Sequence, residues 1–282
     1  MPELPEVETT RRALEPHLVG KTFSGVALDW PTAVAYPDVG TFERRLVGRR
    51  VVRLDRRGKH LIIALDDGSL LIAHLRMTGS LQLLARDAAP TAFTRNRLLL
   101  DGAMELRFVD VRKFGQLWLV GADEPGALPY RLAGPEPLDP AFTRERFAEL
   151  AHSRRGKLKA TLLDQHFLAG MGNIYVDEAL FAARLHPERA LESLSDAEIA
   201  RLHEAIVAVL ERGVANLGTS YRDFVGPFGG RGTNQEELQV WRRAGSPCPR
   251  CGAPIEKHRV AGRGTYYCPS CQVREPLPPP LP

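Results

Sequence analysis

The chain has 282 residues, of which 44% are hydrophobic and 26% are charged, and this is the composition of a globular protein with a sizeable core. A formal net charge of +4 is compatible with a polyanionic partner but does not establish one. No apolar run is long enough to span a bilayer, and the N-terminus MPELPEVETT lacks the basic-then-apolar order of a signal peptide. We therefore expect a cytoplasmic protein of one or two domains without a membrane partner.

The first third of the chain predicts one helix followed by a β-rich domain. After Pro5, residues 6–18 place Val7, Leu14 and Leu18 on one helical face, and Gly20 is suited to end the helix. Short apolar runs follow, separated by Arg-Gly and Asp-Gly pairs that are typical of hairpin turns. These runs are residues 51–54, 61–65, 70–75, 98–100 and 104–108. We expect them to form an antiparallel β-sandwich or barrel.

Beyond the Pro-rich segment 134–140, which predicts a linker, the pattern becomes helical. Ser195 and Glu198 form a capping box that begins a helix, and Gly218 is suited to end that helix. The apolar residues that follow at helical spacing are Ile199, Leu202, Ile206 and Val209. The glycine-rich segment 219–234 indicates either a disordered loop or a lid over a ligand. The tail at 274–282 is rich in proline, and we expect it to be disordered.

A basic run lies between residues 44 and 59, where Asp55 is the only acid. Its members are Arg44, Arg45, Arg49, Arg50, Arg53, Arg56, Arg57 and Lys59. Such a run forms either a solvated face or a phosphate-binding surface, and its closeness to other candidate residues favours the second interpretation.

The four cysteines form two CxxC pairs near the C-terminus, Cys248 with Cys251 and Cys268 with Cys271. Two such knuckles can wrap one tetrahedral zinc ion, because each presents two thiolates from a tight turn. The alternatives are coincidence or two redox pairs. Four thiolate ligands leave no open position, so the pattern predicts one structural Zn²⁺ that holds a small hairpin together.

Pro2 is the first candidate for chemistry. If Met1 is removed, Pro2 carries a secondary α-amine, and α-amines have a reference pKa near about 8, so a useful fraction is neutral and nucleophilic. Glu3 is then the nearest carboxylate for proton transfer. Met-Pro-Glu alone is weak evidence, because many proteins begin this way without catalytic reason.

Other short motifs follow in a fixed order: RRGKHLI at 56–62, HLRMTG at 74–79, DVRKFG at 110–115, GMGNIYVDE at 170–178 and the paired CxxC knuckles. With MPELPEVE at the N-terminus, the chain resembles the bacterial formamidopyrimidine-DNA glycosylase family from residue 1 to about Gln272. The loop 219–234 is the stretch least similar to that family.

The resemblance implies an α+β fold in three parts. These are an N-terminal helix with an antiparallel β-sandwich (1–133), a helix–two-turn–helix domain (134–235) and a zinc-finger hairpin (236–273). It further implies a monomer that acts on damaged double-stranded DNA at the bacterial nucleoid. The implied activity is bifunctional: excision of 8-oxoguanine and formamidopyrimidines through a Schiff base at Pro2, then β,δ-elimination at the abasic site.

The resemblance also implies roles for single residues. The catalytic group would be Pro2, Glu3, Lys59 and Arg263, with Glu6 in support and Arg263 also binding phosphate. The residues that would contact DNA are His74, Met77, Arg112, Phe114, Lys159 and Asn173. Met77, Arg112 and Phe114 would fill the gap that a flipped nucleotide leaves.

Ordinary structural explanations exist for several of these residues. Met77 and Phe114 could be core residues, although each lies beside a turn glycine. Asn173 could cap a helix, and a helix N-terminus is also a natural phosphate site. Two rival functions are an endonuclease VIII-type enzyme that prefers oxidised pyrimidines, which Leu4 disfavours because that family typically has Gly there, and a DNA-binding damage sensor without a free Pro2 amine.

Overall fold

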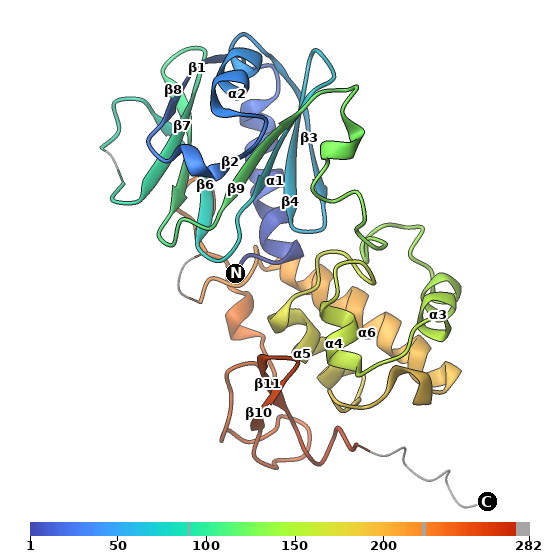
Figure 1. Ribbon diagram of the computed structural model, residues 1–282. Helices are drawn as coiled ribbons and strands as arrows, with labels where there is room; N and C mark the ends of the chain where they lie inside the picture. Colours follow the sequence, from blue (N-terminus) through green and yellow to red (C-terminus); the bar gives the residue numbers. More distant parts are fainter. Residues whose placement is uncertain (90, 222–223, 275–282) are drawn as a thin grey trace, which may run out of the picture. The chain divides into compact units, whose positions relative to one another are not determined.

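The computed structural model describes residues 1–89, 91–221 and 224–274 (Figure 1). Most of the predicted tail at 274–282 therefore lies outside the described residues. The chain divides into two compact units, each made of two segments. The first unit combines Met1–Leu132 with Gly213–Gln235, and the second combines Ala133–Arg212 with the described residues from Glu236 on. The structure thus groups 213–235 with the N-terminal segment, and the boundaries at 134 and 236 that the resemblance implies stay a prediction.

The first unit begins with helix α1 (Leu4–Leu18), which starts two residues earlier than predicted. Pro5 lies in its first turn, where a missing N–H costs nothing. Glu6 reaches back to accept a hydrogen bond from the backbone N of Glu3 at 2.7 Å, which completes a capping box. Residues Val7, Leu14 and Leu18 are all buried, as the helical pattern predicts.

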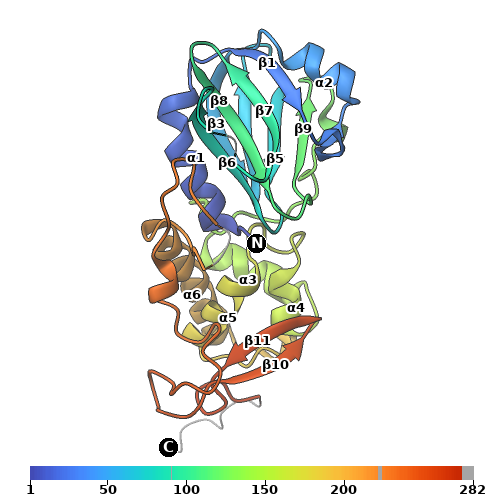
Figure 2. The same cartoon turned by 90° about the vertical axis from the view of Figure 1, so that its left-hand side faces the viewer.

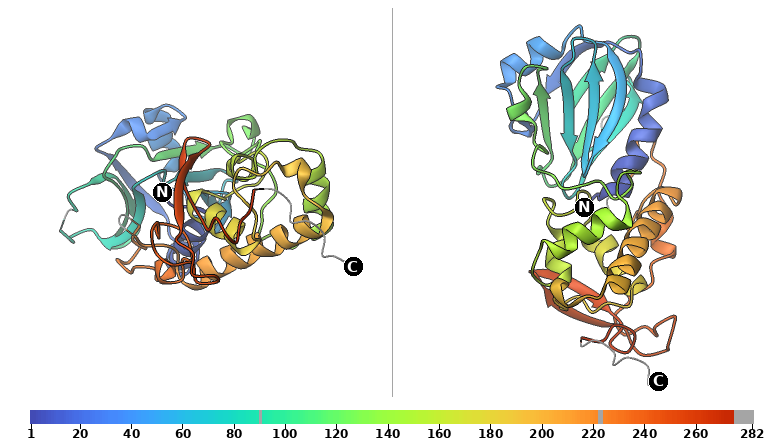
Figure 3. Two further views of the ribbon diagram at one scale, coloured as in Figure 1. Left: turned by 90° about the horizontal axis from the view of Figure 1, so that it is seen from below. Right: turned by 90° about the vertical axis from the view of Figure 1, so that its right-hand side faces the viewer.

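Two sheets form the β-sandwich of this unit. Their strands are β1 (Phe23–Leu28), β2 (Val34–Tyr36), β3 (Val51–Arg57), β4 (His60–Leu65), β5 (Leu70–His74), β6 (Gly79–Ala85), β7 (Thr94–Leu100), β8 (Met104–Asp110) and β9 (Gln116–Val120). The four-stranded sheet has the order β1-β7-β8-β6 and is antiparallel throughout (Figure 2). The five-stranded sheet has the order β2-β9-β5-β4-β3 (Figure 3, right). Its pairs are antiparallel except β2 with β9, which run parallel, so the expectation of a purely antiparallel arrangement fails at this edge.

The helices are α2 (Val39–Leu46) and the short η1 (Pro31–Ala33), η2 (Pro125–Ala127) and η4 (Asn234–Glu236). One hydrophobic core joins α1, α2 and both sheets, with Leu14, Phe42, Leu61, Leu81 and Phe108 among its members.

The described residues of the second unit form four α-helices, one short 3-10 helix and a two-stranded hairpin. They are α3 (Arg144–His152), α4 (Leu158–Leu163), α5 (Asn173–Ala182), η3 (Leu191–Ser193), α6 (Asp196–Ala215), β10 (Glu256–Val260) and β11 (Arg263–Tyr267). The predicted capping box is present, because Glu198 accepts a hydrogen bond from the backbone N of Ser195 at 2.9 Å. The division between the units falls inside α6. Among the helices built from described residues, none combines the length and the apolar composition that crossing a membrane requires.

Candidate active site

The N-terminal residues are buried and fixed by Glu6. Pro2 and Glu3 are both buried, and the side chain of Glu6 is 1% exposed. One carboxylate oxygen of Glu6 accepts from Glu3 N and the other accepts from Thr219 N, each at 2.7 Å. Gly218 adopts φ +80° and lies so close to Glu6 that a Cβ would come within 2.9 Å of its Cγ. The N-terminus and the start of the 219–234 segment are therefore held by one carboxylate.

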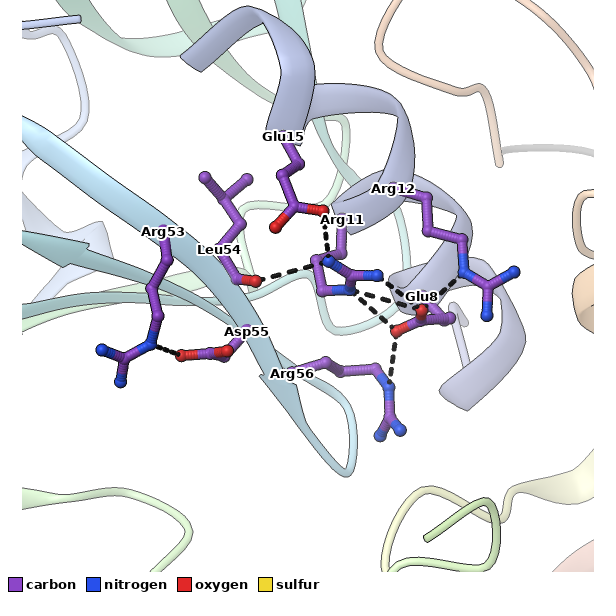
Figure 4. Close-up of polar contacts among 8 residues, drawn as sticks. All are labelled: Glu8, Arg11, Arg12, Glu15, Arg53, Leu54, Asp55 and Arg56. Atoms are coloured by element: carbon purple, nitrogen blue, oxygen red, sulfur yellow. Dashed lines mark hydrogen bonds and ion pairs between the residues drawn. The ribbon is translucent and has the colours of Figure 1, made fainter. Parts of the chain in front are cut away.

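Lys59 is the second residue of the two-residue turn between β3 and β4, and Glu8 anchors this turn to α1 (Figure 4). Arg56 donates from Nε to Glu8 at 3.3 Å and from Nη1 to the carbonyl of Gly58 at 3.0 Å. Although burial alone raises the pKa of Glu8, the hydrogen bond from Arg11 and those from its other arginine partners hold it below its ordinary value. Glu8 is therefore a charged acceptor shared by several arginines. Arg56 links it to the carbonyl of Gly58, and the buried Lys59 is the next residue in the chain.

Three other arginines of the basic run pair with acids. Arg45 pairs with Glu124, Arg49 with Asp67 and Arg53 with Asp55, at 2.9, 3.0 and 2.6 Å. These are partly exposed pairs, which contribute little free energy. They favour the solvated-face interpretation for these arginines over a dedicated phosphate surface.

His74 lies at the end of β5, where its ring meets that of His60 at 4.7 Å between centroids. Burial is the main reason that the pKa of His60 falls to about 4 and that of His74 to about 2. The positive charges of Arg76 and Lys59 lower both further, which places Lys59 in the same neighbourhood. Both imidazoles are neutral near pH 7, and His74 Nδ1 accepts from the backbone N of Arg76 at 3.0 Å.

Met77, Arg112 and Phe114 form a contiguous exposed cluster. Met77 is 38% exposed and Phe114 is 50% exposed, so neither is a core residue. Arg112 donates to the sulfur of Met77 at 3.0 Å, and its guanidinium lies 4.7 Å from the centre of the Phe114 ring. An exposed thioether, a planar cation and an aromatic ring are thus presented together, as filling a gap in stacked bases requires.

Asp110 organises this cluster and is not among the residues predicted from the sequence. Its buried carboxylate accepts hydrogen bonds from the backbone N of Arg112, Phe114 and Gly115 at 3.1, 2.8 and 2.8 Å. It also accepts from the hydroxyl of Thr78. One charged group therefore fixes the turn after β8 and joins it to the turn before β6. An acid that opens the motif DVRKFG was the available signal.

Two glycines beside the cluster are required by close contacts. A Cβ on Gly79 would lie 2.4 Å from the carbonyl oxygen of Leu75, and one on Gly115 would lie 2.3 Å from Cζ of Phe108. Real Cβ atoms do not approach neighbours so closely, and the first neighbour is backbone. Both glycines allow the exposed turns to sit directly on the sandwich.

The described residues of the 219–234 segment bind one another and the sandwich. The hydroxyl of Ser220 accepts from Gly232 N and donates to the carbonyl of Phe224, both at 2.9 Å, and Leu83 N in β6 donates to the carbonyl of Pro227 at 3.0 Å. A mainly apolar pocket of about 480 Å³ lies between this segment and α1. The ordered contacts favour the lid interpretation over a disordered loop for these residues.

In the second unit, Arg263 begins β11 directly after a two-residue turn. The turn residues Ala261 and Gly262 have φ of +50° and +73°, which is the pattern of a type I′ hairpin. Val260 pairs with Arg263 across the hairpin, and Arg263 is exposed. The turn therefore presents this guanidinium to solvent at the tip of the hairpin.

Asn173 is the first residue of α5, and the capping position belongs to Gly172, so the capping interpretation of Asn173 is wrong. Its Nδ2 instead donates to the carbonyl of Gly264 at 2.9 Å. Lys159 is fully buried, with Nζ 2.6 Å from Oδ1 of an equally buried Asp177. Burial raises the pKa of Asp177, and the charge of Lys159 opposes that rise. The structure thus places Lys159 inside the unit, and its predicted DNA contact stays a prediction.

The cysteine thiols meet as the spacing predicts. All four sulfur atoms lie within 4.8 Å of one another. A tetrahedral zinc with Zn–S bonds of about 2.3 Å sets its sulfurs about 3.8 Å apart, and the Cys248–Cys271 and Cys251–Cys268 separations are 3.9 and 3.5 Å. The residues present therefore fit a metal ion of the zinc class.

Comparison with known proteins agrees with this arrangement. Residues 1–117 match the formamidopyrimidine-DNA glycosylase N-terminal domain, residues 133–225 match the H2TH domain of the same enzyme, and residues 245–273 match a zinc finger found in FPG and IleRS. The formamidopyrimidine-DNA glycosylase of Moorella thermoacetica is 50% identical over 92% of this chain and 95% of its own length. That of Desulforamulus reducens is 46% identical over 96% and 99%.

Solved structures show the same likeness. Wild-type Lactococcus lactis Fpg in complex with DNA containing N7-benzyl-Fapy-dG is 39% identical, with a TM-score of 0.89 over 96% of this chain and 100% of that chain. MutM in complex with DNA containing carbocyclic 8-oxo-G gives the same identity, TM-score and coverage. The chain therefore belongs to the formamidopyrimidine-DNA glycosylase family.

Proposed function

We propose that this chain excises 8-oxoguanine and formamidopyrimidines from duplex DNA and then cleaves the strand as an AP lyase. The observation that carries the proposal is the buried start of α1, where Glu6 fixes Glu3 beside Pro2, in the unit that also presents Met77, Arg112 and Phe114. Family membership supports it, because relatives in solved structures hold DNA that contains N7-benzyl-Fapy-dG or carbocyclic 8-oxo-G.

The chemistry begins with removal of Met1, which frees the Pro2 amine. The nitrogen attacks C1′ of the damaged nucleotide, and the glycosidic bond breaks as the base leaves with a proton that Glu3 can transfer. Opening of the sugar ring gives an iminium ion, a Schiff base between Pro2 and the ring-opened sugar. Loss of a C2′ proton then expels the 3′ phosphate, and a second elimination expels the 5′ phosphate, which leaves phosphates on both sides of the gap.

The other residues bind and position the DNA. Lys59 lies at the turn held to α1 by Glu8 and acts next to the lesion, while Met77, Arg112 and Phe114 replace the extruded nucleotide. Arg263 and Asn173 bind phosphates, and His74 supports the Lys59 region as a neutral imidazole. One structural zinc ion held by Cys248, Cys251, Cys268 and Cys271 stabilises the hairpin that carries Arg263.

The proposal extends to the oligomeric state, the form of the DNA and the location in the cell. The enzyme acts as a monomer on damaged double-stranded DNA, and a bacterial enzyme with that substrate works at the nucleoid in the cytoplasm. The second candidate is an oxidised-pyrimidine glycosylase. A solved structure of Lactococcus lactis Fpg with DNA that contains an oxidised pyrimidine supports this candidate. Leu4 and the Arg112–Phe114 pair favour oxidised purines.

Trapping the covalent intermediate tests the role of Pro2. Borohydride reduces the iminium to a stable amine, so we expect a protein–DNA adduct whose cross-linked peptide begins at Pro2. Protein that retains Met1 has an amide nitrogen at Pro2 and should give no adduct, which makes it the matched control. An adduct through an internal lysine, identified by mass spectrometry, would show that the nucleophile is wrongly assigned.

A further inference from the structure

The strand that begins with Arg263 is held by side chains of α4 and α5. The carbonyl of Gly264 accepts from Asn173 Nδ2 at 2.9 Å and from Lys159 Nζ at 3.2 Å. Two residues further along β11, the backbone N of Tyr266 donates to Asp177 Oδ2 at 3.0 Å. Because β10 bonds the other edge of β11, the backbone next to Arg263 is fixed from both sides.

Asp177 is the centre of this arrangement. Its two carboxylate oxygens have different partners. Oδ1 accepts from Lys159 Nζ at 2.6 Å, and Oδ2 accepts from the backbone N of Tyr266 in the hairpin. Asn173 and Asp177 are four residues apart on α5, so both face the same side. The carboxylate therefore orients the lysine that binds Gly264 and also binds the hairpin itself.

The burial of this pair argues for a positioning role. Lys159 and Asp177 are each 0% exposed, so neither side chain is presented at the surface. A buried ion pair is often no more stabilising than well-packed apolar residues, because desolvation offsets the attraction. The directional bonds of the pair do fix geometry, because Lys159 binds the carbonyl of Gly264 and Asp177 binds the backbone N of Tyr266. Asn173 adds a second bond to the Gly264 carbonyl, so two peptide groups directly after Arg263 are held in place.

We propose that Asp177 is a positioning residue that, through Lys159 and Tyr266, sets the place of the Arg263 guanidinium for phosphate binding. It contacts no DNA itself. The inference rests on the proposed function, in which Arg263 binds phosphate. It also gives Lys159 a role exerted through the hairpin instead of on the damaged base.

The test uses variants of the full-length zinc-loaded protein. Asp177→Asn leaves Lys159 charged and buried, which threatens folding, so the main variant is the double substitution Asp177→Leu with Lys159→Met. Glu198→Gln is the matched control, because it breaks the Arg189–Glu198 ion pair of the same unit, and in the described part of the chain neither of these residues hydrogen-bonds to the hairpin. Zinc content and melting temperature are measured for each variant.

The first readout is amide hydrogen exchange of the DNA-free protein. Loss of the Asp177 acceptor should expose the Tyr266 amide, so the double variant should exchange faster across 263–267 while Glu198→Gln does not. A double variant with wild-type exchange in this segment overturns the proposal.

The second readout is a double-mutant cycle with Arg263→Ala, measured as the dissociation constant for a duplex with an abasic-site analogue. We expect the double variant to weaken binding about tenfold when Arg263 is present, since small displacements of a binding group have large effects. The effect should fall below about twofold in the Arg263→Ala background, because coupled residues are not additive. Equal loss in both backgrounds overturns the proposal.

The two proposals fail in different ways. If Arg263→Ala alone leaves DNA binding and cleavage unchanged, the role assigned to Arg263 under the proposed function is wrong. The exchange measurement then decides by itself whether Asp177 holds the hairpin. If Arg263→Ala weakens binding but the cycle is additive, only the positioning role of Asp177 is lost.

Discussion

Single buried carboxylates hold the functional turns of this chain. Asp110 collects the backbone N–H groups of the turn carrying Arg112 and Phe114, Glu6 joins Glu3 to Thr219, and Glu178 accepts from the backbone of Gln239, Val240 and Trp241. Hydrogen bonds to a charged acceptor contribute about 1.5–3 kcal/mol each, roughly twice a neutral bond. An acid in such a place therefore helps to determine the shape of a turn.

Asp110→Asn tests this at one residue. The amide has one acceptor oxygen, and its NH₂ group would face donors that now have no partner, so we expect about 2–4 kcal/mol of lost stability. Single-turnover cleavage should fall by at least about tenfold, because the Arg112–Phe114 turn is displaced. Denaturant unfolding and cleavage are measured beside Asp101→Asn, an exposed acid in the β7–β8 turn. Wild-type cleavage by Asp110→Asn would show that the turn forms without this carboxylate.

The sequence predicts the exposed residues of the site better than the buried residues that hold them in place. Met77, Arg112 and Phe114 stand in short motifs, so residue type and order were enough to group them, and the structure brings them together. Asp110 and Asp177 act through bonds to backbone groups that only the folded chain brings near them. The burial of Lys159 was likewise beyond the sequence, because its partner lies 18 residues away on another helix.

At the scale of elements, strands that flank a local turn signal were predicted correctly. Strands whose pairing partners are distant in the sequence were not. The runs beside Arg57-Gly58, Asp67-Gly68 and Asp101-Gly102 became β3–β4, β4–β5 and β7–β8 hairpins. The sequence does not predict β1, β2, β6 and β9, whose positions depend on strands distant in the sequence. Helix α2, which Asp38 caps through a bond from Thr41 N, is also not predicted.

The neighbouring strands β4 and β5 should make stability depend on pH through His60 and His74. Both imidazoles are buried and neutral in the folded state, with pKa values of about 4 and about 2, whereas the unfolded chain takes up protons near pH 6.5. Between pH 6.5 and about 4 the unfolded state binds more protons, so stability is lost as pH falls. The expected slope is about 1.4 kcal/mol per pH unit for each histidine.

Urea unfolding at pH 7.5, 6 and 5 measures this dependence. His60→Phe is the matched variant, since it keeps an aromatic ring against Trp118 and Tyr130 and removes one titrating group. We expect its slope between pH 6 and 5 to be about half that of the wild type. An unchanged slope would mean that other groups cause the pH dependence.

The zinc-finger element should depend on its metal. Cys248 and Cys268 are buried in a small cluster with Phe181, Val240 and Ile255, which is too little apolar surface to hold a fold alone. Cys248→Ser should release zinc, expose the 236–273 segment to protease and weaken DNA binding, while the sandwich, with its separate core, stays folded. Metal analysis, limited proteolysis and DNA titration measure these effects. Full-affinity binding by zinc-free protein would contradict the structural role of the metal.

At the scale of the whole molecule, the chain assigns different tasks to its two units. The first contains the candidate nucleophile, the gap-filling cluster and the 219–234 segment, and the second contains the hairpin with Arg263 and the cysteine cluster. The resemblance predicted the family and the kinds of element correctly. It did not foresee that 213–235 groups with the sandwich, because Glu6 and Leu83 bind that segment from far away in the sequence.

The choice of damaged base and of the base opposite it is expected to depend on Arg112, in the gap-filling cluster of the first unit. Arg112 offers only donors, so it suits an orphaned base rich in acceptors on its pairing edge, such as cytosine with O2 and N3. Cytosine is the partner of a base that began as guanine. We therefore expect 8-oxoguanine and formamidopyrimidines to be excised fastest opposite cytosine.

Single-turnover rates on matched duplexes that differ only in the lesion or the opposite base measure this preference. Arg112→Ala should lower the rate opposite cytosine more than the rate opposite adenine, because adenine gains less from an arginine that has no acceptor to offer its amino group. Arg76→Ala is the control, since Arg76 is also exposed but donates to Gln116 outside the cluster. Faster excision of thymine glycol than of 8-oxoguanine would assign the chain to the oxidised-pyrimidine class, and equal losses opposite both bases would mean that Arg112 fills the gap without reading the orphaned base.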